Sequence, residues 1–279
     1  MIPARFDYVA PGSLEEALTA LRDGGEDAKV LAGGHSLIPL MKLRLSAPSL
    51  LVDLRLVPGL TGIQRENGSV RIGAMTRHHD VAVGGLGLAS QASGTIADQQ
   101  VRNRGTIGGT LAHGDPASDM PAILLAYEGS VTIRGEAGQR EVAGADLFED
   151  FLTTAVGEGE ILTEVRLPAL DGYGHGYHKF NRRQEDWAMV AVSALVKKAP
   201  DGTCEDVRIG LTHLGSIPLR ATAAEQALRG QPLDAEHIAA AAEHAADGTE
   251  PPADLNASAD YKRHLARVLC RRAIEDASS

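Results

Sequence analysis

The sequence predicts a protein of the mixed α+β or α/β class, and three observations support this prediction. Short apolar runs typical of strands alternate along the chain with runs typical of amphipathic helices. Glycine accounts for 31 of the 279 residues and aromatic residues for only 4%, which is typical of a loop-rich α/β protein. Two stretches also place adjacent glycines between apolar residues. A chain of this length forms one large domain or two to three small ones, and we divide it at residues 1–57, 58–170 and 171–279.

Residues 1–57 are predicted to form a small βαβ unit. Ser13 followed by Glu16 is a capping box, which predicts that a helix begins after Ser13. The adjacent glycines Gly24 and Gly25 end that helix. Beyond it, apolar runs predict a strand, a helix or turn, and a second strand at residues 29–32, 36–43 and 50–54.

Residues 58–170 are predicted to form a second α/β unit. Strands are expected at residues 70–72 and 131–133 and after a turn at residues 158–160, and helices at residues 76–83 and 86–92. Asp115 is expected to cap a helix that begins at Pro116.

Residues 171–279 are predicted to form a third unit. The closely spaced glycines Gly172, Gly174 and Gly176 predict a flexible junction at its start. A polar run then leads into two strands, two helices and a final amphipathic helix. The second strand is expected at residues 207–211, the two helices at residues 221–230 and 234–247, and the apolar face of the last helix at Tyr261, Leu265, Val268 and Leu269.

Charge and cysteine content exclude several classes of function. The formal net charge of −10 argues against binding to nucleic acid or to an anionic membrane surface, and we attribute it to solubility. The two cysteines, Cys204 and Cys270, lie far apart, so no cysteine-ligated iron–sulfur cluster and no disulfide framework is expected in this chain. No apolar run approaches about 18 residues, and because residues 1–6 lack an apolar h-region, no signal peptide is expected. We therefore expect a cytoplasmic protein that is not an integral membrane protein.

Two glycine-paired stretches carry the functional interpretation. One spans Lys29–Ile38 with its pair at residues 33–34, and the other spans residues 105–110 with its pair at residues 108–109. Adjacent glycines allow positive φ and let N–H groups approach a ligand without a Cβ in the way. A concave run of N–H groups is an anion nest that suits a pyrophosphate, so two such loops suggest one long ligand with two phosphates. The G-x-G-x-x-G pattern of a Rossmann fold is absent, and the nearby hydroxyl donors are Ser36, Thr106 and Thr110.

Several polar side chains near these stretches allow two interpretations. His35 either contacts the phosphates or ribose of a ligand, or contributes only its backbone. His113, Asp115 and Asp119 have the composition of a metal site, but Pro116 breaks the helical spacing that would bring them together, so no metal is predicted. Because no nucleophile has an adjacent base and no pair of acids has a convincing spacing, no catalytic residue is predicted either.

Taken together, the runs LAGGHSLIPLMKLRL and TIGGTLAHGDPASDMPA resemble the FAD-binding medium subunits of the molybdenum hydroxylases. The similarity covers nearly the whole chain, with aerobic carbon monoxide dehydrogenase as the nearest branch and xanthine dehydrogenase as a more distant one. It implies a PCMH-type (vanillyl-alcohol-oxidase-like) FAD-binding domain of two α/β subdomains, followed by a C-terminal domain with a small antiparallel sheet and helices. Thr110 departs from the family pattern, in which asparagine is common at this position.

The resemblance implies one FAD, bound non-covalently. Asp119 is then expected to bind a polar group such as the ribose hydroxyls, while Ile161 and Leu162 pack near the isoalloxazine. Trp187, the only tryptophan, lies beside the flavin ring or, alternatively, anchors a core or an interface. The full set of implied FAD-binding residues is Lys29, Leu31, Ala32, Gly33, Gly34, His35, Ser36, Leu37, Ile38, Ile96, Thr106, Ile107, Gly108, Gly109, Thr110, His113, Asp119, Ile161, Leu162 and Trp187.

The resemblance also implies an electron-transfer role within a larger enzyme. In the resembled complexes a large molybdopterin subunit oxidises the substrate, and a small [2Fe–2S] subunit passes the electrons to FAD, so molybdopterin and iron–sulfur clusters are expected only in partner chains. We expect a dimer of heterotrimers that reduces an external acceptor such as a quinone or NAD. Aerobic carbon monoxide dehydrogenase is the expected enzyme. An aldehyde, purine or N-heterocycle dehydrogenase and a free-standing FAD oxidoreductase are the alternatives.

Overall fold

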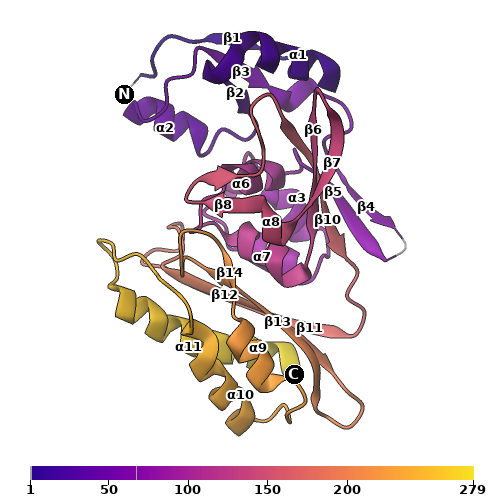
Figure 1. Cartoon of the computed structure of the whole chain (residues 1–279), viewed down its shortest axis with the longest axis vertical. Coiled ribbons are helices and arrows are strands. Elements are labelled where there is room, and N and C mark those ends of the chain that lie inside the picture. The colour runs from indigo at the N-terminus through magenta and orange to yellow at the C-terminus, as the bar shows by residue number, and fades with distance from the viewer. Residues whose placement is uncertain (1, 67) are drawn as a thin grey trace.

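A computed structural model describes residues 2–66 and 68–279. Three units, each built around its own sheet, follow one another along the long axis of the molecule, with the N-terminal unit at one end and the C-terminal unit at the other (Figure 1). The predicted mixed α/β class is therefore confirmed. The predicted domain boundaries after residues 57 and 170 stay predictions. None of the helices in the described residues combines the length and apolar character needed to cross a lipid bilayer.

The first unit is a parallel sheet with strand order β1-β3-β2. The Ser13 half of the predicted capping box is confirmed, because Ser13 Oγ accepts from the Glu16 amide at 3.1 Å. Glu16 Oε2 accepts from the Gly12 amide at 2.8 Å, one residue before the N-cap amide that a capping box would use. The helix ends where predicted, because Gly25 takes a φ of +61°. The elements are β1 Asp7–Val9, α1 Leu14–Gly24, β2 Ala28–Leu31, α2 Leu37–Leu43 and β3 Leu50–Asp53.

The second unit is an antiparallel sheet with strand order β4-β5-β10-β6-β7, covered by short helices. Its strands are β4 Ile63–Glu66, β5 Ser69–Gly73, β6 Ser130–Gly135, β7 Gly138–Ala143 and β10 Ile161–Pro168, with a small separate pair β8 Phe148–Asp150 and β9 Thr153–Thr154. Its helices are α3 His78–Val83, α4 Leu88–Gly94, α5 Gln99–Arg102, α6 Ile107–His113, α7 Asp119–Tyr127 and α8 Gly144–Leu147. The helices predicted at residues 76–83 and 86–92 are present, but each begins two residues later than predicted. In α3 the reason is that Arg77 is extended, at ψ 149°.

The third unit is an antiparallel sheet with strand order β11-β12-β13-β14, and its helices cover one face (Figure 1). The predicted flexible junction is wrong at Gly174 and Gly176, because both lie inside strand β11. A Cβ at Gly174 would lie 2.0 Å from the Ala277 carbonyl oxygen, so these glycines let α11 pack closely onto the strand. The elements are β11 Tyr173–Phe180, β12 Val190–Lys198, β13 Cys204–Thr212, β14 Leu219–Arg220, α9 Thr222–Leu228, α10 Ala235–Ala242 and α11 Ala259–Ser278.

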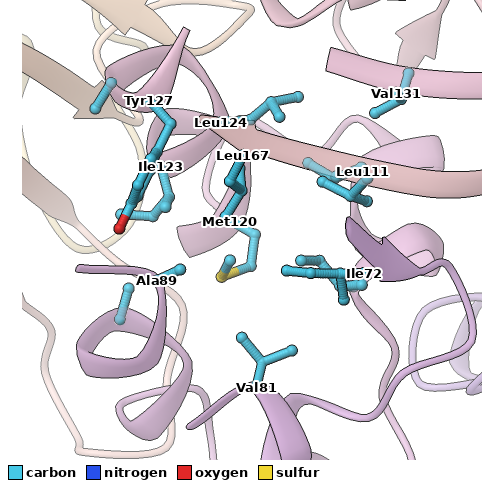
Figure 2. Close-up of a cluster of buried hydrophobic side chains, with 14 of the residues drawn as sticks. Ile72, Val81, Ala89, Leu111, Met120, Ile123, Leu124, Tyr127, Val131 and Leu167 are labelled. Carbon is cyan, nitrogen blue, oxygen red and sulfur yellow. The ribbon is translucent and has the colours of Figure 1, made fainter. Parts of the chain in front are cut away.

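Helix α7 joins the second and third units. All nine of its residues are buried, which is the pattern of a helix enclosed on all sides. Its apolar side chains share one core with side chains of the second sheet and of β12, as Figure 2 shows around Met120, Ile123 and Leu124. A helix buried between two sheets holds both units in a fixed relation, and its first residue, Asp119, is fixed with it.

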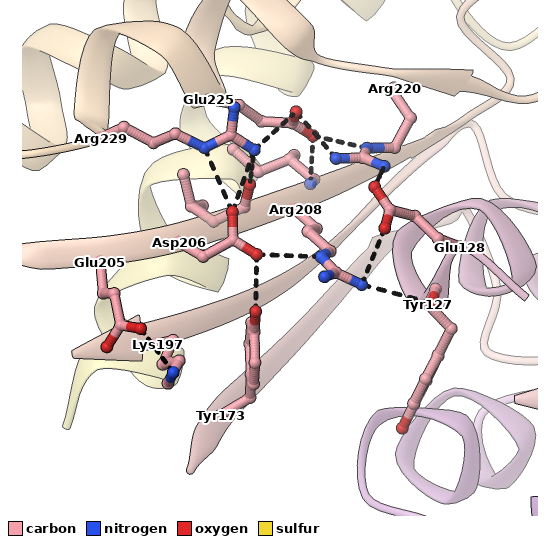
Figure 3. A network of polar contacts seen from close by, with 12 residues as sticks. Tyr127, Glu128, Tyr173, Lys197, Glu205, Asp206, Arg208, Arg220, Glu225 and Arg229 are labelled. Carbon is pink, nitrogen blue, oxygen red and sulfur yellow. Dashed lines mark hydrogen bonds and ion pairs between the residues drawn. The ribbon is translucent and has the colours of Figure 1, made fainter. Parts of the chain in front are cut away.

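A polar network strengthens the same junction (Figure 3). Glu128, directly after α7, pairs with Arg208 at 3.2 Å and with Arg220 at 3.1 Å, and both arginines belong to the third sheet. Glu225, only 2% exposed, accepts from Arg220 at 2.6 Å and from the Ile209 amide at 2.7 Å. The buried Glu225 holds Arg220 within the third unit, and the pairs of Arg208 and Arg220 with Glu128 link that unit to the end of α7.

Candidate cofactor-binding site

A cavity of about 900 Å³ lies where the three units meet. Its lining comes from the turn after β2, from α6, from the turn at residues 156–160 and from the loop between β11 and β12. Ligand pockets in proteins commonly measure about 300–1,000 Å³, so this cavity suits a large ligand. The structure brings the following predicted residues together in its lining: Lys29, Ala32, Gly33, Gly34, His35, Ser36, Leu37, Ile96, Thr106, Gly109, Thr110, His113, Asp119 and Trp187.

The first glycine pair forms an open turn between β2 and α2. Gly34 has a φ of +79°, which favours glycine. Within residues 2–66 and 68–279, the amides of residues 33–36 have no hydrogen-bond acceptor, while the Gly34 carbonyl accepts from the Ile38 amide at 3.0 Å. A run of consecutive unpaired amides at a cavity wall can hold an anionic group.

The second glycine pair does not form the predicted loop. It lies in the first turn of α6, where Thr106 is the N-cap. The four amides of residues 107–110 all have acceptors within the protein: Thr76 O at 3.0 Å, Ala74 O at 2.8 Å, Thr106 Oγ1 at 3.2 Å and Thr106 O at 3.1 Å. The prediction of a second nest of free amides is therefore wrong.

Close packing explains these glycines instead. A Cβ at Gly108 would lie 2.4 Å from the Ala74 Cβ, so only glycine lets α6 lie against that segment. A Cβ at Gly33 would lie 2.5 Å from the Arg104 carbonyl oxygen, in the chain that leads to the second pair. The two stretches are therefore in contact. The second stretch contributes two hydroxyl groups to the cavity lining, those of the half-buried Thr110 and the buried Thr106.

Asp119 lies in the cavity wall, but both of its oxygens are engaged. Lys179 Nζ lies 3.1 Å from Asp119 Oδ2, and the Tyr177 hydroxyl donates to Asp119 Oδ1. The side chains of Lys179 and Asp119 are only 6% and 4% exposed. Burial, followed by the charge of Asp119, holds the pKa of Tyr177 well above its ordinary value, so this hydroxyl keeps its proton. The sequence analysis missed Lys179; its only signal is that Tyr177 and Lys179 alternate onto one face of β11.

Of the two residues considered with Asp119 as metal ligands, His113 lines the cavity and Asp115 does not. Burial lowers the pKa of His113. Asp115 does not cap a helix at Pro116, as predicted, because α7 begins only at Asp119. It accepts instead from the Ala117 amide at 2.8 Å in a local turn. In the described part of the chain, no three His, Cys, Asp or Glu side chains gather as metal ligands would.

His78 is a second lining residue that the sequence analysis missed. It is 4% exposed, and its Nδ1 atom is buried without a hydrogen-bond partner among the described residues. Burial, with a smaller contribution from His35, lowers the pKa of His78 to about 4, so the ring is neutral at pH 7. It packs against Gly105, where a Cβ would lie 2.8 Å from the ring.

Six predicted residues do not line the cavity. Ile161 and Leu162, 2% and 5% exposed, belong to apolar cores, although the turn directly before them does line it. In that turn, Glu160 accepts from the Gly157 amide at 2.8 Å, and its hydrogen bond with Arg140 holds the pKa of its carboxyl below the ordinary value. The other four outside the lining are Leu31, Ile38, Ile107 and Gly108.

Trp187 lies at the rim of the cavity, in the loop between β11 and β12. Its side chain is 55% exposed, so the alternative that it anchors a core within this chain is wrong. The next residue, Ala188, is 1% exposed, and its carbonyl oxygen lies 2.9 Å from His213 Nδ1. The loop therefore presents an aromatic ring beside the cavity while its end is fixed to the third unit.

Comparison with known proteins gives two family matches that together cover most of the chain. Residues 4–170 match the FAD-binding domain of molybdopterin dehydrogenases, and residues 175–277 match the C-terminal domain of the carbon monoxide dehydrogenase flavoprotein. The carbon monoxide dehydrogenase medium chain of Hydrogenophaga pseudoflava is 41% identical, over 99% of this chain and 98% of its own length. The alpha subunit of the 6-hydroxypseudooxynicotine dehydrogenase complex of Paenarthrobacter nicotinovorans is 39% identical, over 99% of this chain and 96% of its own.

A solved structure shows the same fold. A chain of the Hydrogenophaga pseudoflava carbon monoxide dehydrogenase that lacks the Mo-pyranopterin moiety matches with a TM-score of 0.96 and 43% identity. The match covers 99% of this chain and 98% of that one. The architecture expected from the sequence resemblance is therefore confirmed over the full length.

Proposed function

Because this chain belongs to the family of FAD-binding subunits of molybdopterin dehydrogenases, we propose that it is the flavin relay of a larger enzyme. It takes electrons from [2Fe–2S] clusters in a partner subunit and passes them to an external acceptor. The observation that carries this proposal is the cavity at the junction of the three units, with the unpaired amides of residues 33–36 in its wall. The chain is thus an oxidoreductase subunit whose cofactor is FAD.

The residues of the cavity fit this cofactor. The free amides of residues 33–36 would hold the pyrophosphate, and the hydroxyl of Thr110 adds a donor nearby. Lys179 brings a buried cation that partly balances Asp119, and Trp187 offers a ring at the rim for apolar contact with the flavin. None of these contacts is a covalent attachment, so acid denaturation should release the flavin.

Flavin, when bound, accepts electrons singly and gives them up in pairs, which suits a link between iron–sulfur clusters and a two-electron acceptor. The chain itself supplies binding and shape. Both of its cysteines are buried, and burial raises the pKa of Cys204 to about 11 and of Cys270 to about 12. Neither thiol is therefore placed to act as a thiolate ligand, and the clusters belong to a partner.

The proposed partners are a large molybdopterin subunit and a small [2Fe–2S] subunit, assembled in the cytoplasm as a dimer of heterotrimers. We propose an aerobic carbon monoxide dehydrogenase as the enzyme, with a quinone, NAD or another compound as acceptor. The similarity to the 6-hydroxypseudooxynicotine dehydrogenase subunit supports a second candidate, the same relay in a dehydrogenase of N-heterocycles or of aldehydes or purines. The flavin-binding chain does not distinguish these candidate enzymes, because the large subunit binds the substrate.

Spectroscopy of the isolated chain and of its complex tests this proposal. Dithionite should reduce the flavin of the isolated chain, whereas carbon monoxide or an organic substrate should not. In the complex the substrate should bleach the flavin band, and removal of the iron–sulfur clusters should stop that bleaching. Turnover of a substrate by the isolated chain would instead establish a free-standing FAD oxidoreductase.

A further inference from the structure

His213 connects two walls of the cavity. It is the first residue after β13, and its backbone is left-handed at φ +64°. Its amide donates to the Pro116 carbonyl at 2.9 Å, in the segment that carries Ser118 to the cavity. Its ring Nδ1 lies 2.9 Å from the carbonyl oxygen of Ala188, directly after Trp187. One residue of the third unit therefore holds both segments.

The partners of the ring determine its tautomer. A carbonyl oxygen only accepts, so Nδ1 of His213 carries the proton and donates to Ala188. The other nitrogen, Nε2, lies 3.2 Å from Lys262 Nζ and accepts from it. Burial lowers the pKa of His213 against the opposing effect of the Ala188 carbonyl, so the ring stays neutral at pH 7 and keeps this arrangement.

The Nε2 side of the His213 ring contacts a buried lysine, which is itself paired with a carboxylate. Lys262, in the first turn of α11, is 0% exposed, and its Nζ lies 2.6 Å from Asp254 Oδ2. Burial opposes the ionisation of Asp254, but Lys262 and two backbone amides outweigh it and lower the pKa of that carboxyl to about 2. The result is a continuous line of hydrogen bonds from Asp254 through Lys262 and His213 to Ala188.

The loop at residues 181–189 is hydrogen-bonded to the rest of the chain through this line. Asn181 Nδ2 donates to carbonyls of the same loop, and the Met189 amide donates to the Phe180 carbonyl at its base. Across residues 2–66 and 68–279, the bond from His213 is the one hydrogen bond that ties this loop to a distant segment. Without it, the loop that carries Trp187 is held by its own ends and by the packing of the buried Ala188 and Met189.

We propose that His213 is a positioning residue of the cavity, which holds Trp187 at the rim through the Ala188 carbonyl and is itself held by the buried Lys262. This inference rests on the proposed FAD site and adds to it. His213 does not line the cavity. It acts through the loop. The buried Lys262, paired with a carboxylate that is 31% exposed, keeps the Nδ1 donor of His213 directed at the Ala188 carbonyl.

Two variants of the full chain isolate the donor. His213→Asn keeps an N–H near the position of Nδ1. His213→Asp introduces a side chain of the same size as asparagine but without that N–H. Both residues tolerate a left-handed backbone. Trp187 is the only tryptophan, so its fluorescence anisotropy in FAD-free protein reports on this loop alone. The Asn variant should match the wild type in anisotropy and in the Kd for FAD within about twofold. The Asp variant should lower the anisotropy and weaken FAD binding by about five- to tenfold, the effect of one lost hydrogen bond.

Glu225→Gln is the matched control, since it weakens the same domain without contact to the loop. It should lower thermal stability and leave both the anisotropy and the Kd unchanged. The positioning role is overturned if His213→Asp leaves the anisotropy unchanged, or if Glu225→Gln changes it equally. If His213→Asp does not fold, Lys262→Met takes its place. Loss of the lysine that holds the His213 ring should also lower the anisotropy. A wild-type chain that binds no FAD would refute the FAD function, whereas the anisotropy would still test His213.

Discussion

The two glycine pairs look alike in the sequence and serve opposite purposes in the fold. The pair at residues 33–34 lies in an open turn, where the amides of residues 33–36 have no acceptor in the described chain. The pair at residues 108–109 lies in the first turn of α6, where the amides of residues 107–110 are all bonded within the protein. A glycine pair therefore indicates close approach of the backbone. Only the hydrogen-bond partners show whether a ligand or the protein itself makes that approach.

The largest effect is expected at the second pair. In Gly108→Val the new Cβ would lie 2.4 Å from the Ala74 Cβ and 2.8 Å from its backbone, which cannot move as a flexible side chain does. Overpacking typically costs about 1–3 kcal/mol and occasionally more. Because backbone atoms stand in the way here, the free energy of unfolding in urea should fall by about 3 kcal/mol. A variant that folds with unchanged stability would show that α6 does not pack as described.

The next largest effect concerns the stability of the folded chain in acid, and it arises at His78, which packs against Gly105 just before the second pair. Burial lowers the pKa of His78 from 6.5 to about 4 in the folded chain, so the unfolded chain takes up the proton first as the pH falls. The free energy of unfolding should therefore fall by about 3 kcal/mol as the pH falls from 6.5 to 4, and it should stay at its full value above pH 6.5. Urea unfolding at pH 7 and pH 4.5 should show a smaller loss in His78→Gln. His35→Gln, which changes an exposed ring in the first stretch, should behave much like the wild type, and an equal loss in all three proteins would contradict this account.

The first pair should respond in ligand binding more than in stability. Gly34→Ala places a Cβ at φ +79°, which costs about 1–2 kcal/mol and distorts the turn that presents the free amides. FAD affinity should fall by about tenfold or more. Gly25→Ala is the matched control, because it has a φ of +61°, open space around it and no part in the cavity. Equal FAD titrations for the two variants would remove the distinction between the pairs.

The smallest effect is expected at the cap of α6. Thr106→Ala removes the oxygen that accepts from the Gly109 amide at 3.2 Å, and loss of an N-cap costs about 1 kcal/mol. Thr106→Ser keeps that oxygen and should restore most of the stability in thermal unfolding. If serine and alanine lose the same stability, the cap is not what Thr106 provides.

Local rules predicted the parts of the fold that depend on near neighbours. The bond between Ser13 and Glu16 spans three residues, so a capping box reveals it directly. The acceptors of the Ile107 and Gly108 amides are the carbonyls of Thr76 and Ala74, respectively, about thirty residues earlier, and no local pattern shows them. The glycines of β11 were misread for the same reason, because α11, which packs on them, follows about a hundred residues later.

The cavity shows the same limit. Residues near the glycine pairs could be identified from the sequence, since both stretches reach the cavity. Lys179 and His78 could not, because β11 and α3 reach it only through the packing of the three units. Ile161 and Leu162 were placed at the flavin by resemblance, but their side chains fill cores directly after the turn that lines the cavity.

Amide-resolved hydrogen exchange of the chain with and without FAD tests the central claim most directly. The amides of residues 33–36 should exchange quickly in the free protein and become protected when FAD binds. The amides of residues 107–110 should be protected in both states, because the protein already supplies their acceptors. Protection that FAD induces at residues 107–110, with none at residues 33–36, would contradict the assignment of the pyrophosphate to the first glycine pair.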